Sequence, residues 1–163
     1  MGSPKEKEFI WMLLQDILPV NGRLNRKNSD KRCLRVVNST MNLTKCIEIQ
    51  DRLHFFINCP VVKETFESLL KILEMFLRKQ VTELQILHLS FGTVNKKLTK
   101  IGIWFVVKFL YKMYSSQRFE VKQILESIRL EMTFYETHFG GYARMDEFKS
   151  LKTLLNDEIR VCN

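Results

Sequence analysis

Apolar side chains recur at steps of three and four residues along most of the chain, and this spacing is what most constrains the fold. The clearest series is formed by Val62, Phe66, Leu69, Leu73, Phe76 and Leu77. Side chains at these steps lie on one face of an α-helix, so the series predicts a helix over about 61–79 with one buried face. Pro60 suits the start of that helix, because the N–H that proline lacks would have no partner in the first turn.

The same spacing predicts five further helices, over about 5–18, 83–89, 95–115, 119–138 and 145–159. Thr82 and Asn95 can cap two of them, and Gly140-Gly141 can end another. Residues 36–50 are polar and irregular and leave room for a short strand. We expect four helical side chains to be buried: Phe66, Leu69, Trp104 and Phe105.

The composition fits one helical domain. Of 163 residues, 45% are hydrophobic and 27% are charged, as in an ordinary globular protein that can bury a core. We therefore predict an all-α fold and a single helical domain of about six helices over 1–163. Residues 5–60 would hold the first helix, an irregular basic N-terminal arm and a degenerate zinc-knuckle-like turn, and residues 61–163 the helical body.

Three side chains that can bind a soft metal ion lie close together in the sequence: Cys46, His54 and Cys59. A structural Zn²⁺ takes four sulfur or nitrogen ligands, commonly two neighbouring cysteines followed by a second pair a few residues apart. His54 and Cys59 fit the second pair. The chain has no Cys-x2-Cys, so Cys33 would have to supply the fourth ligand across the loop that separates it from Cys46. The alternative is that no metal binds, and that these are buried thiols and a packed histidine.

The densest positive charge lies just before and after Cys33. Six basic side chains occur within residues 23–35, opposed only by Asp30: Arg23, Arg26, Lys27, Lys31, Arg32 and Arg35. With a net charge of +8, this arm favours an anionic partner such as RNA or DNA. No aromatic residue is interleaved, so we expect contacts to phosphates rather than stacking on bases. The alternative is a solvated loop without a partner.

The order of several motifs carries a family resemblance. Phe9–Leu24 includes Trp11 and the turn Leu18-Pro-Val-Asn21, and it is followed by Cys33-Leu-Arg-Val36 and by Gln50–Pro60 with its final Cys-Pro. Residues 5–70 resemble the zinc-binding region near the C-terminus of non-LTR retrotransposon reverse transcriptases. This family would have a cysteine at Val36 and often a glutamate at Gln50. Residues 98–118 resemble, more loosely, the helical tail that follows.

This resemblance implies a non-catalytic accessory domain that helps to grip template RNA or target DNA, with zinc as its cofactor. The chain would be part of such an enzyme or the product of a gene derived from one. The sequence itself carries no glycine-rich phosphate loop, no Gly-x-Ser-x-Gly and no His-Glu-x-x-His, so we expect no enzyme activity. The alternative function is that of an all-α protein-interaction module that has lost its metal.

The chain shows no sign of secretion or membrane insertion. Residues 1–14 do not have the pattern of a signal peptide, and the most apolar run, Ile101–Tyr111, contains Lys108 and is too short to span a bilayer. We therefore expect an intracellular protein, nuclear or cytoplasmic, with reduced thiols and no membrane contact.

Overall fold

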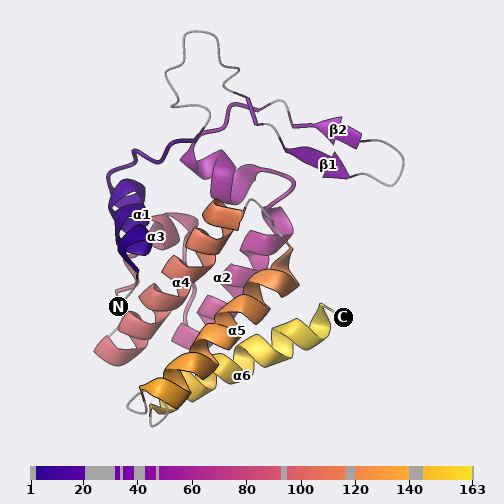
Figure 1. Ribbon diagram of the computed structural model, residues 1–163. Coiled ribbons are helices and arrows are strands. Elements are labelled where there is room, and N and C mark those ends of the chain that lie inside the picture. The colour runs from indigo at the N-terminus through magenta and orange to yellow at the C-terminus, as the bar shows by residue number, and fades with distance from the viewer. Residues whose placement is uncertain are drawn as a thin grey trace. The chain divides into compact units, whose positions relative to one another are not determined.

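The structure is a computed structural model that describes residues 3–20, 32–33, 35–38, 43–46, 48–92, 95–116, 120–139 and 145–162. Within these residues the chain is mainly helical, with six α-helices, one π-helical turn and one pair of short strands (Figure 1). In chain order the elements are α1 (Pro4–Leu14), β1 (Val36–Asn38), β2 (Leu43–Lys45), η1 (His54–Asn58), α2 (Lys63–Leu77), α3 (Glu83–Leu87), α4 (Lys96–Ser116), α5 (Val121–His138) and α6 (Asp146–Val161). The predicted all-α fold of about six helices is confirmed.

Contacts between residues divide the chain into two compact units, 2–67 and 68–163. The boundary falls within α2, close to the boundary predicted between an N-terminal part over 5–60 and a helical body over 61–163. The first unit holds α1, the strands and η1, and the second holds α3 to α6. That the whole chain is one domain stays a prediction.

Local signals set most of the helix ends. The Thr82 hydroxyl accepts a hydrogen bond from the Gln85 amide at 3.2 Å, and the Gln85 side chain accepts one from the Thr82 amide at 2.9 Å, so α3 begins at a capping box. The Asn95 side-chain oxygen accepts from the amides of Lys97 and Leu98 at the start of α4. Both predicted caps are confirmed, whereas Gly140-Gly141 lies outside the described residues.

The first helix is shorter than the sequence predicts. It begins at a capping box between Ser3 and Glu6, but it ends at Leu14 instead of continuing to residue 18. Asp16 adopts φ 54°, the left-handed conformation that commonly ends a helix and that aspartate tolerates better than most residues. Leu18, which follows this turn, is almost fully buried.

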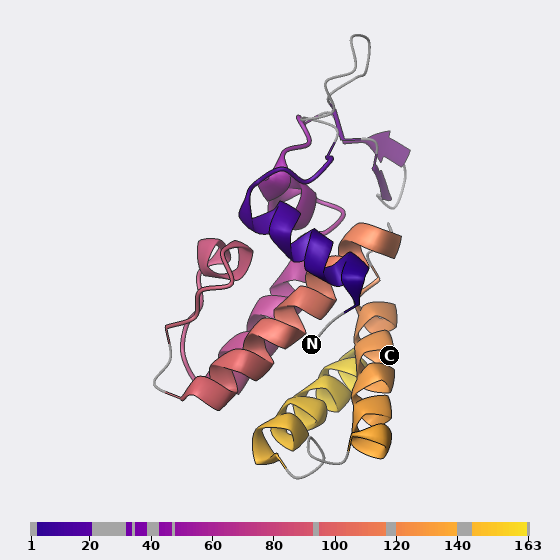
Figure 2. The same ribbon diagram turned by 60° about the vertical axis from the view of Figure 1, so that its left-hand side comes forward.

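The core of the second unit lies where α4, α5 and α6 pack against one another (Figures 1 and 2). Its fully buried side chains include Leu69 of α2, Phe105 and Phe109 of α4, and Leu125 of α5. The rings of Phe105 and Phe109 meet edge to face, with centroids 5.9 Å apart. The predicted burial of Leu69 and Phe105, and that of Phe66 in the first unit, is confirmed.

Trp104 is the exception among the predicted core residues. It is only half-buried, because its indole lies at the edge of the core, where its ring centroid is 6.0 Å from that of Tyr135 and 5.9 Å from that of Phe148. The fully buried positions of α4 are instead those of Phe105, Val106 and the residues one turn further on. An indole is large, and it is rarely enclosed on all sides.

A buried lysine lies between α4 and α5. The Lys108 ammonium is 2.6 Å from one oxygen of Glu131, and the Lys112 ammonium is 2.8 Å from the other. Burial by itself would raise the pKa of the Glu131 carboxyl, but the hydrogen bonds and positive charges of the two lysines outweigh it and hold that pKa below its ordinary value. The apolar middle of α4 therefore contains one buried cation, Lys108, whose charge is compensated by Glu131.

No helix in the described part of the chain combines the length and the apolar character needed to cross a bilayer.

Candidate metal centre

A short β-hairpin brings Cys33 and Cys46 together. β1 and β2 pair antiparallel, with Val36 opposite Lys45. The pairing continues away from the hairpin loop, where the Cys46 amide donates a hydrogen bond to the Arg35 carbonyl at 3.0 Å. One step further, the Cys33 amide donates to the Glu48 carbonyl at 2.8 Å. The loop that separates the two cysteines in the sequence is thus closed by the hairpin, so their distance along the chain is no obstacle to a shared site.

His54 and Cys59 lie at the two ends of η1. The Cys59 amide donates to the His54 carbonyl at 3.1 Å, an i→i+5 bond, which places the two residues next to each other across a single π-helical turn. Asp51 holds the start of the turn, because its carboxylate accepts from the His54 amide at 2.7 Å. π-helical turns are rare, and they occur frequently at functional sites.

Buried aromatic residues anchor this turn in the first unit. Phe55, Phe56 and Ile57, which lie between the two ligands, are all buried. The ring of Phe56 meets that of Phe9 from α1 edge to face, with centroids 6.3 Å apart. The apolar core of the first unit therefore fixes the direction in which His54 and Cys59 point.

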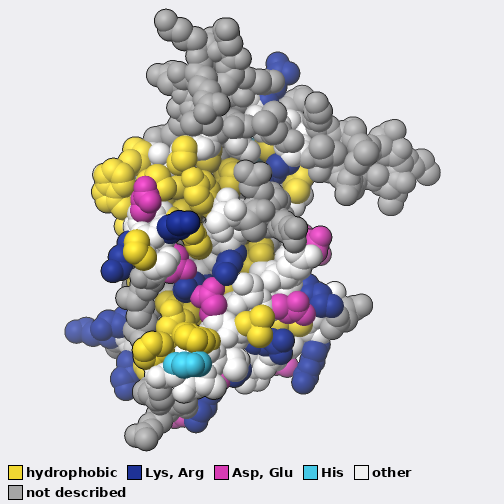
Figure 3. Space-filling model, viewed as in Figure 1, with side chains coloured by type: hydrophobic (Ala, Val, Ile, Leu, Met, Phe, Trp, Pro, Cys, Tyr) yellow, Lys and Arg dark blue, Asp and Glu magenta, His cyan; other side chains and the backbone are white. Residues whose placement is uncertain are grey.

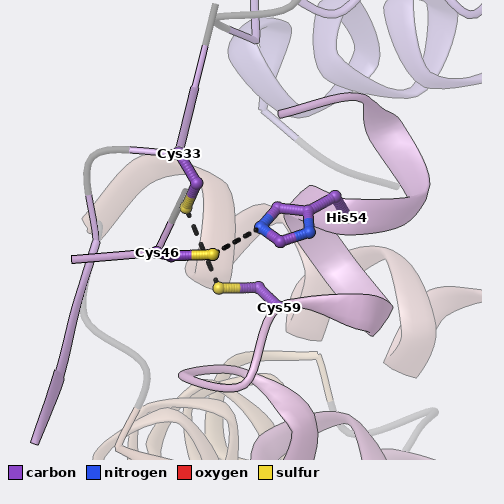
Figure 4. Close-up of side chains that lie close together, drawn as sticks. All are labelled: Cys33, Cys46, His54 and Cys59. Carbon is purple, nitrogen blue, oxygen red and sulfur yellow. Dashed lines mark hydrogen bonds between the residues drawn. The ribbon is translucent and has the colours of Figure 1, made fainter. Parts of the chain in front are cut away.

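The four candidate ligands converge on one point (Figure 4). Their ligand atoms, three Sγ and one imidazole nitrogen, all lie within 4.8 Å of one another. The Sγ atoms of Cys33 and Cys59 are 3.8 Å apart, and Cys46 Sγ is 3.3 Å from His54 Nε2. All four residues are buried, which confirms that the predicted set forms one cluster.

These distances fit a tetrahedral zinc ion. Zn–S bonds of about 2.3 Å and Zn–N bonds of about 2.0 Å at tetrahedral angles separate two sulfurs by about 3.8 Å, and a sulfur from a nitrogen by about 3.5 Å. The Cys33–Cys59 and Cys46–His54 separations, 3.8 and 3.3 Å, are close to these values. The sulfurs are much further apart than the roughly 2.05 Å of a disulfide bond, and all four cysteines are free. The ligand set is compatible with a metal site.

The local environment of Cys33 and His54 favours the uncharged forms of these two side chains. Burial raises the pKa of the Cys33 thiol to about 11, and the nearby Cys59 adds to this effect. Burial, and then the positive charge of Arg35, lower the pKa of His54, so that its imidazole is neutral near pH 7, the form that binds metals. A bound cation would therefore displace thiol protons, because thiolate is the ligand form of cysteine.

Comparison with models of known protein families, with curated proteins and with solved structures found no match. The likeness to retrotransposon reverse transcriptases therefore stays a prediction from the motifs. At Val36, where the family would have a cysteine, the chain begins β1, and the four ligands of the cluster come from the other predicted positions.

Three residues that sequence reasoning did not assign to the site surround it. The Gln50 amide nitrogen donates to Cys33 Sγ at 3.6 Å, Asp51 fixes His54 as described above, and the Arg35 amide donates to the Cys33 thiol. Asp51 could have been found from sequence, because an aspartate three residues before a helical position is a typical cap. Gln50 and Arg35 carry no such local signal.

The predicted phosphate-binding residues are only partly described by the structure. Arg23, Arg26, Lys27 and Lys31 lie outside the described residues, and Arg32 is exposed. Arg35 is half-buried, and its guanidinium lies 4.2 Å from the centroid of the Phe55 ring and donates to the Phe55 carbonyl at 2.8 Å. Arg35 therefore makes internal contacts, and phosphate contact by all six residues stays a prediction.

Proposed function

We propose that Cys33, Cys46, His54 and Cys59 hold one structural Zn²⁺, and that the chain is a non-catalytic, zinc-ordered nucleic-acid-binding module. The observation that carries the metal proposal is the convergence of four buried sulfur and nitrogen atoms within 4.8 Å. Thiolate and imidazole ligands favour zinc over the oxygen-seeking Mg²⁺ and Ca²⁺. Four protein ligands complete the coordination shell, as in structural rather than catalytic zinc sites.

The ion would join two parts of the first unit, the hairpin and the η1 turn. Cys33 and Cys46 come from the base of the hairpin, whereas His54 and Cys59 come from the η1 turn. A single ion bonded to all four would fix the hairpin against the turn. Because such a site does not exist in the unfolded chain, the free energy of metal binding becomes free energy of folding.

The metal proposal is tested by the metal content and thermal stability of the purified, reduced protein. We expect one zinc per chain, a lower melting temperature in chelator and recovery when zinc is returned. Cys59→Ser removes a ligand and should abolish stoichiometric binding. Cys162→Ser is the matched control, because Cys162 is exposed and lies outside the cluster. Metal-free protein with the same melting temperature in chelator would support packed thiols instead.

The nucleic-acid proposal is supported by charge and by position in the sequence. Six basic residues lie within 23–35, and Cys33 lies within the same stretch, so a metal ligand would hold the C-terminal end of the basic arm in place. Arginine and lysine side chains contact phosphates without reading the base sequence, so the partner is RNA or DNA of mixed sequence. The resemblance to a retrotransposon enzyme implies the same class of partner.

Salt-dependent binding tests this second part. Neutralisation of phosphates releases counterions, so log Kd for duplex DNA should change with log salt by roughly 0.9 per contacted phosphate. Replacement of Arg23, Arg26, Lys27 and Arg32 by glutamine should flatten this slope by several units. The matched control replaces four exposed basic residues outside the arm by glutamine: Lys5, Lys63, Lys149 and Arg160. If both quadruple variants bind as the parent does, the arm is not the phosphate-binding element.

A specific observation supports the protein-interaction module as a second candidate. Trp11 is 58% exposed on α1, Leu14 and Ile17 are exposed beside it, and Figure 3 shows hydrophobic side chains gathered at the C-terminal end of this helix. Exposed tryptophan within an apolar patch is typical of protein interfaces. This candidate replaces the first if the parent protein binds neither RNA nor DNA at physiological salt.

A further inference from the structure

The charge of the proposed metal centre calls for a cation nearby. Zinc contributes two positive charges and three thiolates contribute three negative ones, so a site made by Cys33, Cys46, Cys59 and a neutral His54 carries a net charge of −1. Glu48 and Asp51 add further negative charge near His54. All four ligands are buried, and a buried net charge without a partner is costly.

Arg35 is the described cation best placed to supply that charge. Its backbone is hydrogen-bonded to two of the ligand residues. The Arg35 carbonyl accepts from the Cys46 amide at 3.0 Å, and the Arg35 amide donates to the Cys33 thiol. Arg52, by contrast, is bound to the Leu13 carbonyl of α1 at 2.9 Å and to Asp16, which follows α1, at 3.3 Å. Arg32 is exposed to solvent.

The side chain of Arg35 is also fixed beside the site. Its guanidinium lies over the ring of Phe55, the residue after His54, with 4.2 Å between the guanidinium carbon and the ring centroid. One of its nitrogens donates to the Phe55 carbonyl at 2.8 Å. Stacking and hydrogen bonding together hold a planar guanidinium in one orientation, which a flexible lysine would not match.

We propose that Arg35 is the counter-ion of the metal centre, a positioning residue that favours the metal-bound, thiolate form of the site instead of contacting nucleic acid. This inference rests on the proposed zinc site. Without metal, no ion holds the three cysteines as thiolates, so the site has less negative charge for Arg35 to compensate. With metal, three thiolates give the site its net negative charge, and the guanidinium stacked on Phe55, the residue after His54, is attracted to that charge, so Arg35 stabilises the loaded site more than the empty one.

Metal affinity is the measurement that tests this role. Co²⁺ is the probe, because a tetrahedral cobalt–thiolate site absorbs visible light, and competition with Zn²⁺ gives the zinc affinity. Loss of a group that supports metal ligands typically weakens metal binding by about 10- to 100-fold, and we expect a loss of this size for Arg35→Gln. Arg32→Gln removes the same charge from an exposed neighbouring position and should change the affinity less than about threefold.

A lysine variant separates charge from packing. Arg35→Lys keeps the positive charge but loses the planar fork that stacks on Phe55, so we expect it to recover part of the lost affinity. Circular dichroism of the metal-free variants shows whether their folds are equivalent. If Arg35→Lys binds as weakly as Arg35→Gln, the arginine acts through packing and the counter-ion role is overturned.

The outcomes distinguish this inference from the metal site on which it rests. If the parent binds one Co²⁺ and Arg35→Gln binds it as tightly as Arg32→Gln does, the counter-ion role is wrong and the metal site stands. If the parent binds neither Co²⁺ nor Zn²⁺, the metal site is wrong and the role of Arg35 is overturned with it.

Discussion

The ion pairs between α4 and α5 provide a sharp test of the helical body. Lys108 is 5% exposed, and its ammonium is bound to Glu131, which also binds Lys112. Glu131→Gln keeps the size and most of the shape of the side chain but removes its charge. Lys108 then remains buried without the carboxylate that compensates it.

The structure bounds the magnitude of this loss. Removal of one partner from a fully buried ion pair costs about 3–5 kcal/mol, because an uncompensated charge is left inside the protein. The side chains of Glu131 and Lys112 are 27% and 28% exposed, so water can approach the carboxylate. We therefore expect a smaller loss, about 2–3 kcal/mol of the free energy of unfolding.

Urea unfolding of the parent and of Glu131→Gln, followed by far-UV circular dichroism, measures this difference. The midpoint should fall while the slope of the transition stays the same, since the surface exposed on unfolding does not change. The double variant Lys108→Met with Glu131→Leu removes both charges and should recover much of the loss.

The difference should also depend on pH. Because the pKa of Glu131 is lower in the folded than in the unfolded chain, its contribution to stability is present above the unfolded pKa, roughly 4.3. It is lost as the pH falls through the folded pKa, so the two proteins should converge in acid. Equal stability of the parent and Glu131→Gln at pH 7 would show that the Glu131 carboxylate does not compensate the buried Lys108 charge.

Further predictions concern local packing and capping, and each is read from the midpoint of urea unfolding. Gly102→Ala should raise stability by about 1 kcal/mol, because alanine favours a helix more than glycine does. A Cβ at this position meets only ordinary contacts, 3.4 Å from Leu77 and 3.5 Å from Leu73. A loss of stability would mean that the added methyl group does not fit between α4 and α2. Thr82→Ala should lower stability by about 1 kcal/mol, since it removes the α3 cap, while Thr82→Ser should not. Phe109→Ala should lower it by about 3–5 kcal/mol by leaving a cavity in the core, and a loss below about 1 kcal/mol would contradict the packing described.

Features that depend on neighbouring residues could be read from the sequence alone. Apolar residues spaced three and four positions apart indicated the number and the approximate limits of the helices. This spacing places side chains on one face, because it corresponds to about one turn of an α-helix. Thr82 and Asn95 were recognisable as caps, since a cap bonds to amides only two or three residues further along. The early end of α1 was missed because a left-handed residue such as Asp16 need not be glycine.

The candidate metal site was only partly visible in this way. His54 and Cys59 could be paired from their spacing, because a single helical turn joins them. Cys33 and Cys46 could be proposed but not placed, since no short motif connects them and their proximity comes from the pairing of β1 with β2. The four ligand atoms lie within 4.8 Å of one another because the hairpin, with Cys33 and Cys46, packs next to the π-helical turn, with His54 and Cys59.

The roles of several charged and aromatic residues depend on the three-dimensional fold. In the sequence, Arg35 is one of six similar cations, and Lys108 is one charge in an apolar helix. The fold places Arg35 on Phe55 and Lys108 against Glu131, while it leaves Trp104 at the edge of the core. The physical reason is that residue type fixes what a side chain can bind, whereas burial and partners depend on which distant segments the chain brings to it.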